Sequence, residues 1–159
     1  MSAVRTVDRQ SLLADVSGAA RVGDVEAALA DQGLTLDLTA PWDGTVSDWI
    51  AEGAPGARSP WLDPADHLLA GYEARLRDGR TILVRPAPRR AVGPDSLALF
   101  FGTRGRFGTL VAVWIRVHPV DVARPAAPFA HVDPPLERAE EELWNAIATA
   151  FASEVSSKA

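Results

Sequence analysis

DSLALFFGTRGRFGTLVAVWIRVHP, residues 95–119, contains a loop punctuated by three glycines that leads into a long apolar run. The apolar run, Thr109–Val117, has the β-branched and aromatic content of a buried strand, and Pro119 bounds it. The loop, Gly102–Gly108, reads G-x-x-G-x-x-G and precedes a strand, whereas a Rossmann turn reads G-x-G-x-x-G and opens a helix. The sequence therefore predicts either a tight turn into a core strand or backbone that approaches a ligand closely.

On either side of this stretch, the pattern predicts a hairpin and a long helix. Leu68–Arg77 and Arg80–Arg85 are β-prone runs that flank Asp78-Gly79, a pair that supplies the positive φ of a type I′ turn. Leu136–Val155 has helical periodicity, and charge is concentrated toward its N-terminal part. Its apolar stripe consists of Leu136, Leu143, Ile147, Phe151 and Val155, with Trp144 beside it.

The remaining elements are short, and together they indicate an α+β fold. Strands are predicted at Leu12–Ser17 and Leu34–Leu38, and helices at Val22–Gln32, Val46–Glu52 and Ser96–Phe101. Because the hairpin is antiparallel and the connections are short, we expect a mostly antiparallel sheet flanked by helices, plus a C-terminal helix. We expect the α+β domain over residues 1–119, a Pro-rich linker over 120–135, and the amphipathic helix and tail over 136–159.

Length and composition exclude several classes of protein. The 159 residues suit one domain, and 47% hydrophobic content is ordinary for a globular chain. No apolar run approaches the ~18 residues of a spanning helix, and no secretory signal pattern opens the chain, so we expect a cytoplasmic protein without membrane insertion. The absence of cysteine excludes disulfides, thiolate metal sites and a cysteine nucleophile.

Charge is unevenly spread along the chain. The net charge is -5, yet residues 75–116 carry nine arginines against two aspartates. These arginines could pair with the acidic flanks of the folded chain, or they could meet phosphate or an acidic partner surface. Because the chain is acidic overall and shows no recognition motif, we expect no nucleic-acid binding.

Catalytic patterns are absent from the sequence. His67, His118 and His131 have neither metal-ligand spacing nor a tight cluster with carboxylates, and no nucleophile elbow or Walker A loop occurs. We therefore predict no catalytic residues and no metal ligands. Trp114 lies in the apolar run and is expected to be buried, whereas Trp42 and Trp61, in Pro-containing loops, serve either packing or an interface.

Four segments together resemble the second half of the FAD domain of the p-cresol methylhydroxylase / vanillyl-alcohol oxidase superfamily, whose nearest members are glycolate oxidase FAD subunits and D-lactate dehydrogenases. They are Leu12–Leu38, Thr45–Ser59, Leu68–Val84 and Asp95–Pro119. In the last of them, the family pattern reads D-L-x-x-L-x-x-G-S-x-G-x-L-G-V-I, ending at a proline.

The second segment resembles the FAD-contacting pattern T-V/I-G-G-x-I-A-x-G-x-x-G-x-R-S. The resemblance implies cofactor-binding roles for the matching residues, which are Thr45, Val46, Gly53, Gly56, Arg58 and Ser59. Ser47-Asp48 replaces the paired glycines, and an aspartate there brings negative charge toward a negatively charged diphosphate. The loop at 86–94 lacks the Lys-Asn pair of the family. These departures imply that FAD binding is weak or lost.

Two hypotheses of function follow from the resemblance. In that family, a first lobe with a P-x-G-G-G-T loop holds the pyrophosphate and a cap domain carries specificity, and we expect both to be lacking here. The chain is then a non-catalytic scaffold or interaction subunit, with FAD absent from the isolated chain. Alternatively, it is a subunit of a split FAD-dependent oxidoreductase of the 2-hydroxy acid type, whose partner chain supplies the first lobe. A small-molecule binder using the vacated cleft is a third reading.

Either hypothesis predicts association with another chain. The lobe would expose an apolar patch without its partner lobe, so we expect a homo-oligomer or a complex with an oxidoreductase-related chain. Trp42, Trp61 and the C-terminal helix are the candidate contact surfaces. Alternatively, the C-terminal helix covers the exposed face of the lobe itself.

Overall fold

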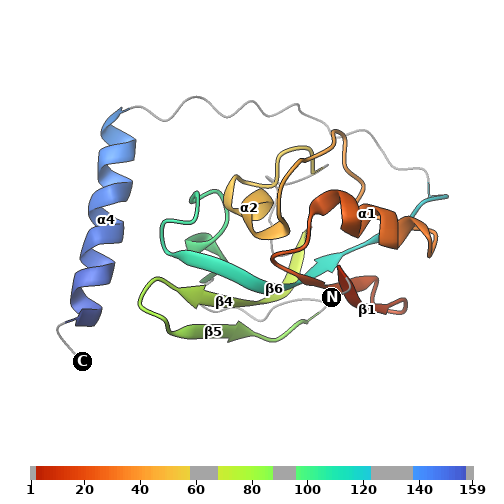
Figure 1. The fold of residues 1–159 in the computed structure, drawn as a ribbon, viewed down its shortest axis with the longest axis horizontal. Coiled ribbons are helices and arrows are strands. Elements are labelled where there is room, and N and C mark those ends of the chain that lie inside the picture. The colour runs from red at the N-terminus through yellow and green to blue at the C-terminus, as the bar shows by residue number, and fades with distance from the viewer. Residues whose placement is uncertain (1–2, 58–67, 88–95, 123–137, 157–159) are drawn as a thin grey trace.

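The computed structural model of this chain describes residues 3–57, 68–87, 96–122 and 138–156. Its centre is a five-stranded, wholly antiparallel sheet with the strand order β1-β2-β6-β4-β5 (Figure 1). The strands are β1 (Val4–Asp8), β2 (Leu13–Ser17), β4 (Leu69–Leu76), β5 (Thr81–Val84) and β6 (Gly108–Arg116). The apolar run that follows the glycine loop is thus the central strand, as its length and composition predict.

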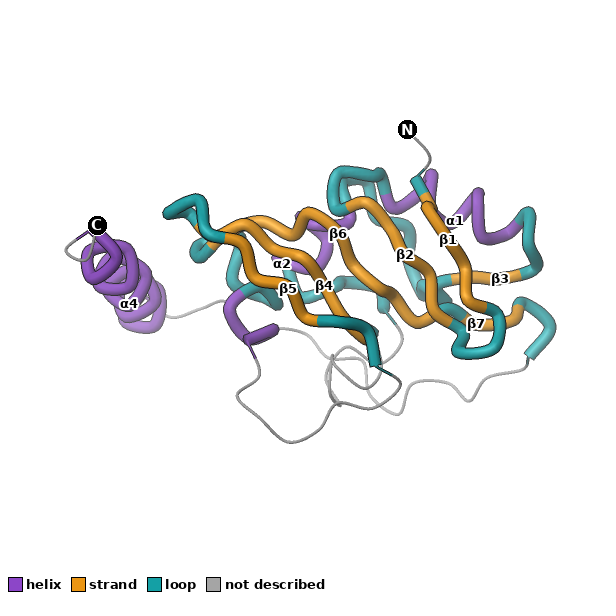
Figure 2. Tube along the Cα trace, turned by 90° about the horizontal axis from the view of Figure 1, so that it is seen from below, coloured by secondary structure: helices purple, strands orange, loops and turns teal. Residues whose placement is uncertain are grey.

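Helices α1 (Val22–Ala30) and α2 (Val46–Ala51) cover one face of the sheet, and Figure 2 shows the five strands in front of them. Their apolar faces are fully buried against the sheet, because residues three and four apart lie on one side of a helix. The shared core includes Val25 and Leu29 of α1, Trp49 and Ile50 of α2, and Val16, Leu69, Tyr72, Val113 and Ile115 of the sheet. The result is the α+β, two-layer arrangement that the sequence predicts.

The predicted hairpin is confirmed, with β4 and β5 joined through Asp78-Gly79. Gly79 has a φ of 87°, but Asp78 does not have positive φ, so the turn is not the type I′ turn that this pair predicts. The N–H of Gly79 donates to the carbonyl of Leu76 at 3.0 Å, and the N–H of Leu76 donates to the carbonyl of Arg80 at 2.8 Å, which closes a longer loop with glycine in the left-handed region. The Asp78 carboxylate accepts a hydrogen bond from the backbone N–H of Arg80 at 2.9 Å. This bond, together with the Arg80 side chain, lowers the pKa of Asp78 below its ordinary value of 3.8.

A small second sheet pairs β3 (Leu34–Thr35) with β7 (His118–Pro119). Of the strand expected at Leu34–Leu38, only the two residues of β3 are in a strand. Asp37, with a φ of 59°, takes the chain out of extended conformation. The expected short helix after Asp95 is a single 3-10 turn, η1 (Ser96–Leu99).

Helix α4 (Arg138–Ser156) stands beside one end of the sheet and covers neither of its faces (Figures 1 and 2). Its bounds agree with the helix expected at Leu136–Val155. The idea that this helix covers the open face of the lobe is therefore wrong for the part of the chain that the structure describes. No helix within the described ranges is long and apolar enough to cross a membrane.

Two elements differ from the sequence-based expectation. The edge strand β1 was not expected, because the run VRTVD places arginine, threonine and aspartate among only two valines. Trp114 is half-buried rather than buried, because it lies opposite Asp15 of β2, on the sheet face away from the helices. Trp49 is instead the tryptophan at the centre of the core.

Candidate functional site

The start of α2 is held by hydrogen bonds within the lobe. Thr45 is the N-cap, and its Oγ1 accepts from the backbone N–H of Asp48 at 3.1 Å while it donates to Asp48 Oδ2 at 2.7 Å. The N–H groups of Val46 and Ser47 donate to the carbonyls of Ala20 and Gly18, each at 2.8 Å. The first three N–H groups of this helix are therefore all engaged before any ligand arrives.

The glycine loop docks on the other end of α2. The N–H of Gly102 donates to the carbonyl of Ile50 at 3.1 Å, and the N–H of Arg104 donates to the carbonyl of Ala51 at 2.8 Å. The second bond satisfies a carbonyl at the helix end, whereas the Ile50 carbonyl also accepts from the N–H of Gly53 at 3.0 Å. Positive φ angles at Gly102 (70°), Arg104 (53°) and Gly105 (69°) fold the loop back on itself before it enters β6. The loop is thus both a tight turn into the core strand and one wall of a pocket.

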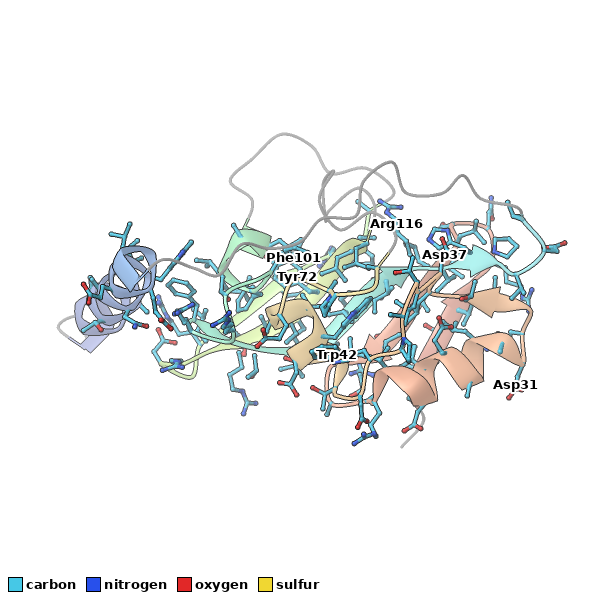
Figure 3. All side chains as sticks on the ribbon, turned by 90° about the horizontal axis from the view of Figure 1, so that it is seen from above. Asp31, Asp37, Trp42, Tyr72, Phe101 and Arg116 are labelled. Carbon is cyan, nitrogen blue, oxygen red and sulfur yellow. The ribbon has the colours of Figure 1, made fainter. Side chains whose placement is uncertain are left out.

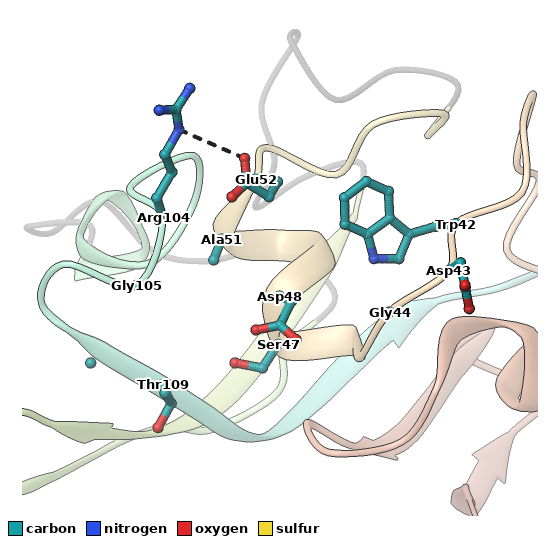
Figure 4. Close-up of a pocket in the computed structure, with 11 residues that line it drawn as sticks. Trp42, Asp43, Gly44, Ser47, Asp48, Ala51, Glu52, Arg104, Gly105 and Thr109 are labelled. Atoms are coloured by element: carbon teal, nitrogen blue, oxygen red, sulfur yellow. Dashed lines mark ion pairs between the residues drawn. The ribbon is translucent and has the colours of Figure 1, made fainter. Parts of the chain in front are cut away.

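That pocket is a cavity of about 340 Å³, and Figure 4 shows its lining residues around α2. The floor is one side of α2 and its C-cap, with Ser47, Asp48, Ala51 and Glu52. The walls are Trp42, Asp43 and Gly44 before the helix, Arg104, Gly105 and Gly108 of the glycine loop, and Thr109 after it. A Cβ on Gly44 would lie 2.7 Å from Nε1 of Trp42, so glycine lets the indole lie close against the chain. The floor is closed beneath because Ser47 Oγ accepts from the N–H of Leu110 in β6 at 3.0 Å.

The charges around this pocket are predominantly negative. Its lining contains three carboxylates, from Asp43, Asp48 and Glu52, against the single guanidinium of Arg104. Arg104 Nε lies 3.7 Å from a Glu52 oxygen, and Asp43 forms an ion pair with Arg21. Asp48 contributes a further negative charge, and its carboxylate accepts from the neutral hydroxyl of Thr45. The described residues contain no cluster of His, Asp or Glu that could hold a metal ion.

The residues expected to bind cofactor have structural roles where the structure describes them. Val46 is fully buried in the core, and Gly53, with a φ of 83°, ends α2 by donating to the carbonyl of Ile50. A Cβ on Gly56 would lie 2.7 Å from the carbonyl oxygen of Ala40, and the Gly56 carbonyl accepts from Thr39. Arg58 and Ser59 lie outside the described residues, as does Trp61.

Sequence reasoning missed the charged rim of the pocket. Glu52 and Arg104 are far apart in sequence and meet only because the glycine loop docks on α2. One prediction from the sequence pointed to this side of the pocket: the alternative for Gly102–Gly108 in which the backbone approaches a ligand closely. No local pattern connected that loop with Trp42.

Comparison with known proteins identifies the family. The family described as "FAD binding domain" matches residues 1–85. Two curated relatives, the uncharacterized FAD-linked oxidoreductases Rv2280 and MT2338 from Mycobacterium tuberculosis strains H37Rv and CDC 1551 / Oshkosh, are each 30% identical over 139 residues, or 84% of this chain. The chain spans 30% of the length of each of these relatives.

Solved structures show the same fold. Two crystal forms of alkyldihydroxyacetonephosphate synthase superpose with TM-scores of 0.63 and 0.61 at 23% sequence identity. They match 77% and 76% of this chain, and the match spans 22% and 23% of their own chains. The α+β lobe predicted from the sequence is thereby confirmed, and the chain belongs to the FAD-binding domain family of the p-cresol methylhydroxylase type.

Proposed function

We propose that this chain is an FAD-binding-type lobe whose flavin contacts have been replaced by contacts within the lobe. It acts as a non-catalytic scaffold or interaction subunit, in which FAD binding is weak or lost. The observation that carries this proposal is the negative pocket beside α2, where Asp43 pairs with Arg21 and Glu52 with Arg104, so that the carboxylate of Asp48 adds a negative charge.

The hydrogen bonds already made by the first N–H groups of α2 support the same proposal. An anion bound at a helix N-terminus needs free backbone N–H groups, and α2 has its first three engaged by Ala20, Gly18 and Thr45. Asp48 adds a carboxylate at the place where backbone would otherwise approach the ligand. At an effective dielectric constant near that of a protein surface, one such charge within reach of a diphosphate disfavours binding by about 1 kcal/mol or more.

The negative charge of the pocket beside α2 should weaken FAD binding to the 159-residue chain. An FAD titration followed by flavin fluorescence measures this binding. We expect no binding tighter than about 100 μM, which corresponds to a binding free energy weaker than about -5.5 kcal/mol. Asp48→Asn keeps the side-chain shape and removes the charge, so any residual binding should tighten about fivefold. Saturation in the low micromolar range by the unaltered chain would contradict the proposal.

The matched control for this titration is Asp31→Asn. Asp31 is an exposed carboxylate at the C-terminal end of α1, and Figure 3 shows it well away from Trp42. The control changes the net charge by the same amount as the Asp48 substitution. It should therefore leave FAD affinity unchanged, and an equal gain in both variants would mean that overall charge, and not the pocket, controls binding.

The second candidate function is a lobe of a split FAD-dependent oxidoreductase of the 2-hydroxy acid type. It is favoured by the curated relatives, which are described as FAD-linked oxidoreductases. In this case, a separate chain would bring the pyrophosphate-binding lobe to the pocket beside α2. Co-expression with a chain that carries the P-x-G-G-G-T lobe distinguishes the two functions, because only the split enzyme would purify as a complex with stoichiometric flavin.

A further inference from the structure

Helix α4 contacts the rest of the lobe through a side that combines polar residues with Trp144. The Arg106 side chain is only 12% exposed, and its Nε donates to Asn145 Oδ1 at 3.2 Å while its Nη2 lies 3.8 Å from a Glu141 oxygen. The ring of Trp144 meets Phe107 edge-on, with 6.4 Å between the ring centroids. Glu141, Trp144 and Asn145 are three and four residues apart, so they form one side of the helix, which is the docked side.

The apolar side of α4 faces solvent and not the lobe. At about 100° per residue, Leu143 lies about 200° around the helix from Glu141, and Ile147 lies about 240° from it. Their side chains are 60% and 44% exposed. A surface helix normally turns its apolar stripe toward the core, whereas α4 turns it toward solvent. Such a stripe marks a surface that another chain covers.

The same chain carries an exposed surface of complementary character on the β4–β5 hairpin. β5 is an edge strand of the five-stranded sheet, and its Leu83 is 58% exposed. Alternation along the strands places Leu83 on the sheet face away from α1 and α2, together with the exposed Arg75 and with Arg85 just after the strand. Glu73, opposite Leu83, is the acidic residue on this surface.

Charge favours contact between these two surfaces. Residues 138–156 of α4 contain four glutamates and one arginine, whereas residues 69–87 contain four arginines and two acidic residues. Glu142, exposed beside Leu143, would face the hairpin arginines once Leu143 and Ile147 cover Leu83. Complementary charges at the rim of an apolar contact steer association and fix its orientation.

We propose that α4 of one molecule docks through Leu143 and Ile147 on the β4–β5 hairpin of a second copy of this chain. The contact forms between molecules because α4 is held to its own lobe by the opposite side, through Arg106 and Phe107. Two such contacts, related by a two-fold axis, close a dimer in which each molecule contributes both surfaces. The inference rests on the interaction role proposed above and gives it a partner. Its test involves no flavin, so its failure would leave the FAD titration standing.

Cysteine crosslinking tests the proposal directly, because the chain has no native cysteine. Ile147→Cys and a size-tagged Leu83→Cys variant are mixed and treated with a short bismaleimide. The expected product is the tagged–untagged heterodimer. The matched control replaces Leu83→Cys with Asp31→Cys, which is equally accessible at the end of α1 and should give no such product.

Every other outcome of this experiment overturns the proposal. A product formed by Ile147→Cys alone would mean that two α4 helices pair with each other, and one formed by Leu83→Cys alone would mean that two β5 edges pair. Sedimentation of the unaltered chain provides an independent measurement, for which we expect a dimer that weakens as salt is raised. The double variant Leu143→Glu/Ile147→Glu should be monomeric with an unchanged circular dichroism spectrum. A monomeric unaltered chain would overturn the proposal whatever the crosslinking shows.

Discussion

Replacing Gly18 with alanine is expected to destabilise the fold by about 3 kcal/mol or more, and this is one of the two largest effects that the structure predicts. A Cβ at this position would lie 1.9 Å from the carbonyl oxygen of Leu110 in β6. Because the clash is with backbone, no side-chain rotation relieves it. Gly18 also donates to the carbonyl of Val111 and accepts from Ser47, so moving it would strain both β6 and the start of α2.

The measurement is urea unfolding of Gly18→Ala beside Gly23→Ala. Gly23 lies in α1 with open space where its Cβ would be, and alanine there should be neutral or stabilising by about 0.5–1 kcal/mol. Equal midpoints for the two variants would show that β6 does not approach Gly18 as closely as the structure places it. Loss of soluble folded protein for Gly18→Ala alone would agree with the expected destabilisation.

Trp49→Ala should destabilise the chain by about 3–5 kcal/mol. Trp49 is fully buried in the core between α2 and the sheet, and its Nε1 donates to the carbonyl of Pro55 at 2.9 Å. Alanine removes the whole buried indole ring and leaves that carbonyl without its donor. Trp49→Phe keeps much of the apolar volume and should lose only about 1–3 kcal/mol, mainly through the unmade hydrogen bond.

The matched control for this pair is Trp144→Ala. Trp144 is 37% exposed on α4, where it meets Phe107 by an edge contact only. Its removal should shift the free energy of unfolding by about 0.5–1.5 kcal/mol, the size of an aromatic pair. Chemical unfolding followed by circular dichroism compares the three variants, and a Trp144 effect as large as that of Trp49 would contradict the assignment of the core.

Local patterns predicted most elements of this fold. Asp78-Gly79 between two β-prone runs predicted the hairpin, although the loop is longer than the expected two residues because β4 ends at Leu76 and β5 begins at Thr81. The spacing of Val22, Val25 and Leu29 gave α1, because these residues line one side of a helix. β1 escaped prediction because an edge strand needs only one buried face, and Val4 is its sole buried residue.

The candidate site could be predicted only in part. The segment around Thr45 was recognised from its pattern, and the departure at Ser47-Asp48 was visible without the structure. What the sequence could not show is that Ser47 ties α2 to Leu110 of β6, or that Arg104 reaches Glu52. Both contacts depend on the docking of segments far apart along the chain, which no local periodicity encodes.

The most direct test of the central claim, that this lobe keeps the family's fold without its flavin, is the absorbance spectrum of the purified 159-residue chain. We expect a colourless protein with no flavin band near 450 nm and no FAD released on denaturation. A yellow protein that releases about one FAD per chain would contradict it, and would show that the negative pocket beside α2 does not prevent flavin binding.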